Sequence, residues 1–170
     1  MYATPITINT TPLQNGASVR SGGSIITIEL NIHADQIVVV GGMQQAMLTC
    51  ALALINEGEV AWIEDPIFHQ AYNVMAFAGA KVVPRPIDRE GLVIGKRSRK
   101  NSPRLIFVTP SHQFPLGVTM SLKRRKALIE FAESCDGYIL EDDYNSEFRF
   151  DGPPLPCLQG LDDEIGRAHV

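Results

Sequence analysis

Two hydrophobic periods alternate along the chain from residue 36 onward. Short apolar runs rich in β-branched residues predict strands at Gln36–Val40, Val60–Glu64, Lys81–Pro86, Arg104–Thr109 and Tyr138–Glu141. Apolar residues at helical spacing predict helices between them, at residues 43–57, 67–78 and 122–135. Strands that alternate with helices of this length predict an α/β fold, in which helices sandwich a mostly parallel sheet.

The sequence also indicates where these helices begin and end. Gly41-Gly42 opens the first helix, and Gly58 is expected to end it in a C-cap role. Apolar residues such as Leu48 and Leu52 extend around the first helix, which predicts that it is buried on all sides. Ser121 is expected to cap the third helix.

Composition narrows the class of protein. The 170 residues are 45% hydrophobic and 20% charged, as in an ordinary globular protein, and the net charge of −4 gives no general reason to expect nucleic-acid binding. The basic residues between 96 and 104 are expected to form a solvated loop. Cys50, Cys135 and Cys157 fit no metal-binding spacing and are expected to be reduced thiols. No apolar run reaches the length of a membrane span and no signal peptide opens the chain, so we expect a cytoplasmic protein.

Two strand ends carry groups that suit a charged ligand. Gly41-Gly42 lies between an apolar strand and a helix, where free N–H groups and the helix dipole favour an anion, although such a turn can be purely structural. The adjacent acids Glu141, Asp142 and Asp143 end another strand and are costly unless a positive group meets them. The candidates are a metal, basic residues or a protonated heterocycle, and the sequence places no further metal ligands nearby.

Two other strand ends carry aromatic and polar side chains. Thr109–Gly117 contains two prolines, a glycine and the polar residues Ser111, His112 and Gln113. Phe68 follows a strand that ends in Glu64-Asp65-Pro66, and by itself it would be a core residue. In parallel α/β sheets, ligands bind at the carboxyl ends of strands, and all four of these motifs lie there.

In order along the chain, the four motifs resemble the sites of fold-type I proteins that bind pyridoxal 5'-phosphate (PLP), from about Ala34 to Asp162. The most specific segments, Thr109–Leu122 and Glu141–Asp151, resemble the MocR subgroup of the GntR regulators. In that subgroup a winged-helix DNA-binding domain is fused to an aminotransferase-like domain. The resemblance therefore implies the large domain of a PLP-dependent transferase.

The resemblance implies a role for six residues. Gly42, Met43 and Gln44 would bind the cofactor phosphate, mainly through backbone N–H groups. Phe68 would stack on the pyridine ring, where the family usually has tyrosine. Asp142 would pair with the protonated ring nitrogen, and Tyr144 would hydrogen-bond the phenolic oxygen. Glu141 and Asp143 would then point elsewhere, toward backbone or a basic residue.

The chain departs from the aminotransferase pattern at two positions. Phe114 stands where aminotransferases have an asparagine that contacts the phenolic oxygen, and either His112 or Gln113 could replace that asparagine. Gly41 stands where a small hydroxyl residue is usual, which removes one phosphate contact.

The resemblance also implies an incomplete domain. The family's Schiff-base lysine lies beyond the acidic strand, whereas all five lysines precede it: Lys81, Lys96, Lys100, Lys123 and Lys126. We therefore expect no catalytic residue here and an inactive, poorly folded fragment. Residues 1–33 match poorly, residues 34–164 form the partial PLP domain, and residues 165–170 resemble a translated sequencing adapter and are expected to be a non-native tail. A genuine short protein is the competing interpretation.

Two functions remain open from the sequence. One is an effector-sensing domain, in which PLP with an amine or amino acid shifts the population of DNA-binding states, and DNA is bound only through a missing N-terminal domain. The other is an aminotransferase. The Ser-His-Gln-Phe-Pro turn favours the regulator, and a plain Rossmann module is disfavoured because no GxGxxG follows a strand. The resemblance further implies a homodimer, and no membrane partner is expected.

Overall fold

The centre of the molecule is a sheet of six strands in the order β1-β8-β7-β4-β5-β6. A computed structural model describes residues 5–8, 18–21, 24–27, 38, 40–96, 102–144 and 157–161. The strands of the sheet are β1 (Pro5–Ile8), β4 (Val60–Asp65), β5 (Lys81–Asp88), β6 (Gly91–Leu92), β7 (Leu105–Val108) and β8 (Tyr138–Asp142). All neighbours pair in parallel except β5 and β6, which form an antiparallel pair.

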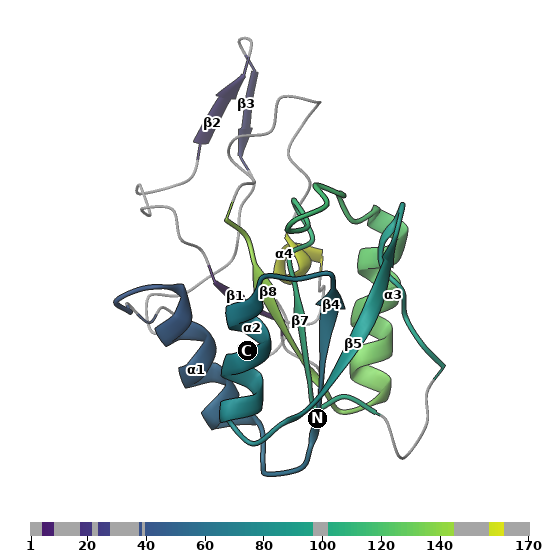
Figure 1. Ribbon diagram of the computed structural model, residues 1–170. Helices are drawn as coiled ribbons and strands as arrows, with labels where there is room; N and C mark the ends of the chain where they lie inside the picture. Colours follow the sequence, from purple (N-terminus) through teal and green to yellow (C-terminus); the bar gives the residue numbers. More distant parts are fainter. Residues whose placement is uncertain are drawn as a thin grey trace, which may run out of the picture.

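Helices cover both faces of this sheet (Figure 1). The helices are α1 (Met43–Leu54), α2 (His69–Phe77), α3 (Leu122–Ser134) and α4 (Leu158–Leu161). Alternate residues of the strands point to opposite faces and build two separate cores. Ile63, Phe107 and Leu140 pack with α1 and α2. Trp62 and Ile106 pack with α3 and α4 on the other face. The predicted α/β fold, with a mostly parallel sheet between helices, is confirmed.

The predicted elements after residue 58 match the structure to within three residues at each end. Ser121 caps α3 as expected, since its side chain accepts a hydrogen bond from the Arg124 N–H. The short strand β6 and the single-turn helix α4 were not predicted, because two to four residues are too few to show a period.

The prediction for α1 is wrong in two respects. The helix ends at Leu54, with Ile55 as its C-cap, so Gly58 lies in the following turn and does not cap it. The helix is also buried on one side only, and Leu52 is 58% exposed. Apolar residues on the outer side of α1 had made the helix look like a core element.

The N-terminal region contains more strand than its sequence indicated. The sequence showed no clear period before Ile25, yet β1 pairs in parallel with β8, and β2 (Ser18–Ser21) forms an antiparallel pair with β3 (Ser24–Thr27). These strands have only four residues each, which is too few to show a clear period, and β1 is defined by its pairing with the distant strand β8. The strand predicted at Gln36–Val40 lies mostly outside the described residues, and Val38 and Val40 are not in a strand.

Of the expected basic loop, residues 97–101 lie outside the described residues. Arg104 is not simply solvated. Its guanidinium forms an ion pair with Asp136 at 3.1 Å and lies 4.7 Å from the centre of the Tyr138 ring. These contacts attach the start of β7 to the turn between α3 and β8.

Candidate functional site: an acidic and aromatic edge of the sheet

The carboxyl ends of β4, β7 and β8 meet at one edge of the sheet. The three strands are parallel neighbours, and Phe107 on β7 lies level with Ile63 on β4 and Leu140 on β8. The residues that follow these positions therefore converge at one edge. The sequence motifs around Glu64, Thr109 and Asp142 are thus neighbours in space, although they are far apart in the chain.

Asp142 is the last residue of β8 and is only 2% exposed. Burial raises the pKa of its carboxyl from 3.8 to about 7, with further contributions from the charges of Asp143 and Glu64. Its Oδ1 atom is buried and has no hydrogen-bond partner among the described residues. An unpaired buried acceptor is costly, so this carboxyl suits a ligand that brings a positively charged N–H group.

Tyr144 follows Asp142 by two residues, just after the end of β8. Its hydroxyl donates a hydrogen bond of 2.8 Å to the backbone oxygen of His112, and its ring meets the His112 ring edge-on. Burial raises the pKa of the Tyr144 hydroxyl, and the charges of Asp142 and Glu64 raise it further. The hydroxyl therefore stays protonated, and its lone pairs can still accept a hydrogen bond.

Phe68 lies at the start of α2, on the same face of the sheet as Leu140 and Phe107. Its ring packs edge-on against Phe107, with a centroid distance of 5.8 Å, and against Phe114, at 6.2 Å. Asp142 follows Leu140 by two residues and extends from the same face. The predicted stacking residue and the predicted acid are thus brought to one side of the sheet.

The glycine pair before α1 has the geometry of an anion site. Gly42 is the N-cap, with φ of 152° and ψ of 172°, a backbone region that favours glycine. A Cβ atom built on Gly42 would have no atom within 4 Å, and α1 has neither a side-chain cap nor an acid in its first turn. The first N–H groups of α1 therefore have no side-chain cap, and an oxyanion could accept their hydrogen bonds. Met43 is partly buried and Gln44 is exposed.

The Gln45 side chain folds back onto the glycine at position 41. The Gly41 N–H donates a 2.6 Å hydrogen bond to the side-chain oxygen of Gln45. A Cβ atom at Gly41 would lie 2.9 Å from the same oxygen. The glycine thus permits a close approach by Gln45 at the place where the family usually has a hydroxyl.

Glu64 is a buried site residue that sequence reasoning missed. It is 1% exposed, and its Oε2 accepts hydrogen bonds from the Thr109 backbone, the Thr109 hydroxyl and the Gln113 amide. Burial raises its pKa to about 7 despite these hydrogen bonds, which lower it. The available signal was an acid that ends a wholly buried strand, the same signal that pointed to Asp142.

Gln113 is not a free substitute for the family's asparagine. Its amide nitrogen donates to the backbone oxygens of Pro66 and Phe114, and its side-chain oxygen accepts from the Leu116 N–H. Through these hydrogen bonds the Gln113 side chain stabilises the turn after β7 to which it belongs. Of the two alternatives, only the exposed His112 still offers a ring without a hydrogen bond among the described contacts.

Glu141 points away from this site, as expected. On the α3 face, its Oε1 lies 3.8 Å from Nη1 of Arg125, and its Oε2 accepts a hydrogen bond from the Leu158 N–H. Both side chains of the Glu141–Arg125 pair are fully buried. Lys123 and Lys126 on the same helix are exposed, so Arg125 is buried although its charged neighbours in the sequence are not. Asp143 is also buried, with Oδ1 unpartnered in the described structure.

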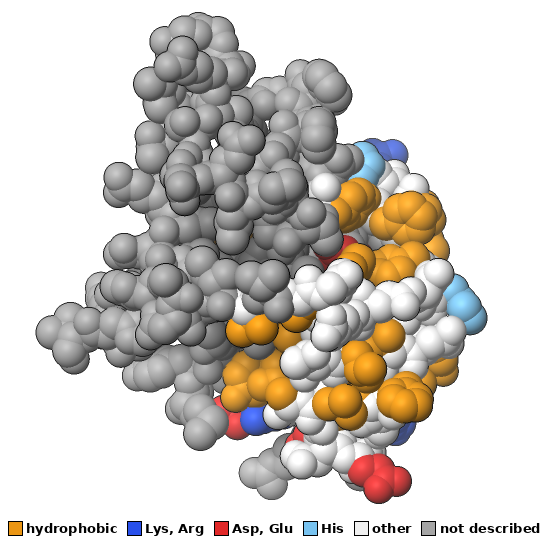
Figure 2. Space-filling model, turned by 90° about the vertical axis from the view of Figure 1, so that its left-hand side faces the viewer, with side chains coloured by type: hydrophobic (Ala, Val, Ile, Leu, Met, Phe, Trp, Pro, Cys, Tyr) orange, Lys and Arg blue, Asp and Glu red, His pale blue; other side chains and the backbone are white. Residues whose placement is uncertain are grey.

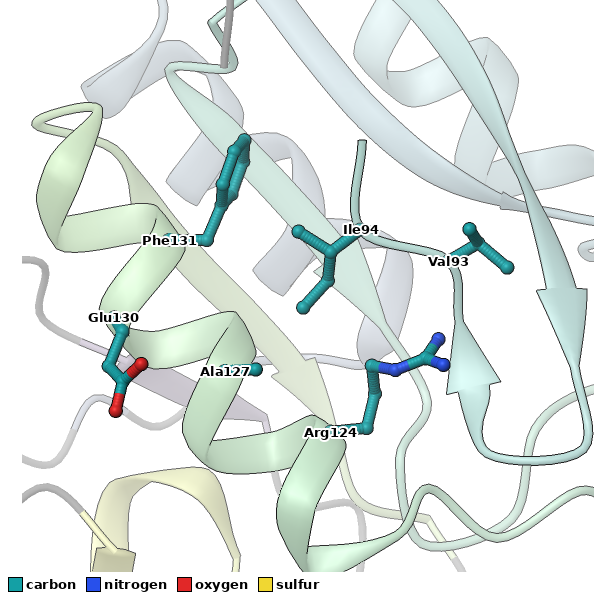
Figure 3. Close-up of a pocket in the computed structure, with 6 residues that line it drawn as sticks. All are labelled: Val93, Ile94, Arg124, Ala127, Glu130 and Phe131. Atoms are coloured by element: carbon teal, nitrogen blue, oxygen red, sulfur yellow. The ribbon is translucent and has the colours of Figure 1, made fainter. Parts of the chain in front are cut away.

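A separate hollow of about 510 Å³ lies between α3 and the segment after β6 (Figure 3). Its lining is mostly apolar and comprises Val93, Ile94, Arg124, Ala127, Glu130 and Phe131. Arg124 already pairs with Asp88 and Glu90. The hollow lies on the face opposite Phe68 and contains none of the groups discussed above, so it does not match a phosphate-containing cofactor.

Two kinds of feature are absent from the described residues. No helix in this part of the chain is long and apolar enough to cross a membrane. No group of three or more His, Cys, Asp or Glu side chains there could bind a metal ion.

Comparison with known protein families gives a match over residues 26–167, to the aminotransferase class I and II model. The chain belongs to the aminotransferase class I and II family. It is 47% identical over 128 residues to the "Probable rhizopine catabolism regulatory protein MocR" of Rhizobium meliloti. It is 33% identical over 132 residues to the "HTH-type pyridoxine biosynthesis transcriptional regulator PdxR" of Corynebacterium glutamicum. The chain is thus an aminotransferase-like domain related to MocR-type regulators.

The fold of this aminotransferase-family chain also matches solved structures. Kynurenine aminotransferase from Pyrococcus horikoshii, in complex with pyridoxamine phosphate (PMP), has a TM-score of 0.64 and 29% identity. That match covers 71% of this chain and 32% of the enzyme. The two regulators are matched over 75% and 78% of this chain but only 26% and 28% of their own lengths. The chain therefore spans about a quarter of these relatives.

The cofactor of this family is PLP, and the residues of the chain fit it. The unpartnered buried oxygen of Asp142 matches the protonated ring nitrogen, and the open N-terminus of α1 matches the phosphate. Phe68 supplies an aromatic ring on the same face of the sheet. The chemistry of the donor groups and the family assignment therefore agree.

Proposed function

We propose that the chain is the PLP-binding, effector-sensing part of a cytoplasmic MocR-type transcriptional regulator. The observation that carries the proposal is the buried, unpartnered carboxyl oxygen of Asp142 on the Phe68 face of the sheet. The identity of 47% to a regulatory protein supports a regulator over an enzyme. DNA would be bound by a winged-helix domain of the full-length protein, and the effector would be an amine or amino acid.

In this proposal each site residue has one task. Asp142 binds the protonated ring nitrogen, and Tyr144 binds the phenolic oxygen. Phe68 stacks on the ring, and the backbone of Gly42, Met43 and Gln44 binds the phosphate. PLP, when bound, supplies an aldehyde that reacts with primary amines and a ring that withdraws electrons. An amine effector is therefore the chemical class that such a site recognises.

The test of the proposed function is binding of PMP, which lacks the aldehyde and so cannot react with surface lysines. We expect saturable binding with one site per chain, which excess inorganic phosphate weakens. Phe68→Ala should lower the affinity by about 0.5–1.5 kcal/mol because the ring contact is lost, whereas Phe68→Tyr should retain it. PMP fluorescence measures all three affinities. A wild-type protein with no saturable PMP site would exclude the proposal.

The fold match to kynurenine aminotransferase favours the alternative, an aminotransferase, and three of the four described lysines test it. Lys81 opens β5 and lies level with Val60, at the end of the sheet opposite Asp142. Lys123 and Lys126 are exposed on α3, on the other face from Phe68. None of these three can reach a cofactor that contacts Asp142.

We therefore expect that borohydride reduction of the protein with PLP leaves no stoichiometric pyridoxyl group on Lys81, Lys123 or Lys126. Mass spectrometry of the reduced protein locates any label. As a control, excess PMP should not change the weak labelling of exposed lysines. Full labelling of one of these three lysines, suppressed by PMP, would show that the site has been placed wrongly.

A homodimer, implied by the resemblance, belongs to the same proposal. The outer faces of α1 and α2 carry exposed apolar side chains, among them Leu52 and Phe77, which is 77% exposed (Figure 2). Contact with a second chain would remove this apolar surface from water, which supports a dimer through this face.

A further inference from the structure

Glu64 connects two segments of the site through a single carboxyl oxygen. Its Oε2 accepts hydrogen bonds from the Thr109 hydroxyl at 2.6 Å, from the Thr109 N–H at 3.2 Å and from the Gln113 amide at 3.3 Å. Glu64 lies on β4, whereas Thr109 and Gln113 belong to the turn that follows β7. Glu64 therefore ties that turn to the carboxyl end of the neighbouring strand.

The partners of Glu64 extend this connection to both sides of Phe68. Gln113 donates to Pro66 at 2.8 Å and to Phe114 at 2.6 Å, both through backbone oxygens. The Phe114 N–H donates to the Thr109 hydroxyl at 3.2 Å. Pro66 lies two residues before Phe68, and the Phe114 ring packs against the Phe68 ring. The hydrogen bonds of Glu64 thus fix the segment that precedes the stacking ring and the turn that flanks it.

The second carboxyl oxygen of Glu64 bears on whether this side chain is ionised. Oε1 is buried and has no hydrogen-bond partner among the described residues, so an ionised Glu64 would leave a desolvated charge. Burial accordingly raises the pKa of Glu64 to about 7. Its charge in turn raises the pKa values of Asp142 and Tyr144. Glu64 and Asp142 lie at the carboxyl ends of β4 and β8, the two strands on either side of β7, so the charge of Glu64 acts on Asp142 across this edge of the sheet.

The other titratable groups near Glu64 come from several elements. Asp142 and Asp143 lie at the end of β8, and Tyr144 follows them. His112 lies in the turn after β7, where its backbone oxygen and its ring contact Tyr144. Arg125 lies across the sheet beside Glu141, in the ion pair already described. Among the described residues, no cation forms an ion pair with Glu64, so nearby acids dominate its surroundings.

We propose that Glu64 is a positioning residue of the cofactor site, which places Phe68 through Thr109 and Gln113 and tunes Asp142 through its charge. This inference rests on the proposed function for the role of Asp142 and Phe68. In the proposed function, Glu64 contacts neither the cofactor ring nor the phosphate. Experiments can test the placing of Phe68 and the effect of the Glu64 charge separately.

Hydrogen exchange in the ligand-free protein tests the positioning. Glu64→Ala should speed exchange of the Thr109 and Phe114 amides about tenfold or more, and should leave the α3 amides unchanged. Glu64→Gln should change them by no more than about twofold, since an amide oxygen can accept the same hydrogen bonds. Thr109→Val, which removes the hydroxyl, should speed Phe114 exchange and provides a second variant. Unchanged exchange in both Glu64→Ala and Thr109→Val would overturn the positioning role.

The pH profile of PMP affinity tests the charge. Glu64→Gln should move the midpoint of this profile to lower pH, because Asp142 then ionises beside one acidic neighbour, Asp143, instead of two. A residue with a structural role alone would leave the midpoint in place, and that result would overturn the tuning role. If the wild-type protein binds no PMP, the proposed function fails, and the exchange data still decide whether Glu64 positions the turn.

Discussion

Replacing Asp142 by alanine is expected to weaken PMP binding by about 1.5–3 kcal/mol, the range for a lost hydrogen bond between charged groups. This loss corresponds to roughly a 10-fold to 150-fold rise in Kd. The physical reason is that Asp142 is only 2% exposed, so bulk water does not screen the contact between its carboxylate and the pyridinium. Isothermal titration or PMP fluorescence measures the change.

Two controls distinguish a binding role of Asp142 from a structural one. Asp143→Ala, at the adjacent buried acid, should affect PMP affinity less than Asp142→Ala. If Asp143→Ala abolishes binding and Asp142→Ala does not, the wrong carboxylate has been chosen. In the ligand-free protein, Asp142→Ala should not lower stability at pH 8, because it removes a desolvated charge that has no partner among the described residues.

The pH dependence of stability has a defined sign. The folded-state pKa of Asp142 is raised from 3.8 to about 7, and that of Glu64 from 4.5 to about 7. The protonated forms therefore favour the folded state. Their contribution is fully present below about pH 4 and is lost as the pH rises to about 7. Asp142→Ala should reduce this loss, and bound PMP should oppose it by pairing with the ionised acid.

The sequence predicted the fold class because its strands are apolar on both faces, as buried parallel strands are. It also placed Asp142 and Phe68 just after strands, and parallel topology then brings such positions to one edge of the sheet. Asp142 and Gly42 were recognisable because each departs from its local pattern: an acid after a buried strand, a glycine pair before a helix. Their roles in binding remain predictions.

The residues that sequence reasoning missed or misread depend on distant partners. Glu64 receives its hydrogen bonds from Thr109 and Gln113, which lie 45 and 49 residues away in the chain. Arg125 adjoins Lys123, Arg124 and Lys126 in sequence, so local context predicted a solvated face. Helix geometry turns Arg125 alone toward the sheet, where Glu141 is buried. Charged residues that are buried because of tertiary contacts leave little local signal.

The buried Arg125–Glu141 pair is expected to be a main source of stability at the carboxyl end of β8. Arg125 is fully buried, and it donates to the backbone oxygens of Met120 at 3.1 Å and Pro110 at 2.8 Å. Its Nη1 lies 3.8 Å from Glu141 Oε1. Arg125 therefore joins α3, the turn after β7 and the strand that carries Asp142.

Arg125→Met is expected to lower the free energy of unfolding by about 3–5 kcal/mol, because it leaves the buried Glu141 charge without its guanidinium. Urea denaturation measures the change. Lys126→Met, at the exposed neighbouring position, should change stability by no more than about 0.5 kcal/mol. Glu141→Gln in the Arg125→Met background should restore part of the loss, since no buried charge then remains. If Arg125→Met costs no more than Lys126→Met, the pair contributes nothing to stability, and another contact must fix the end of β8.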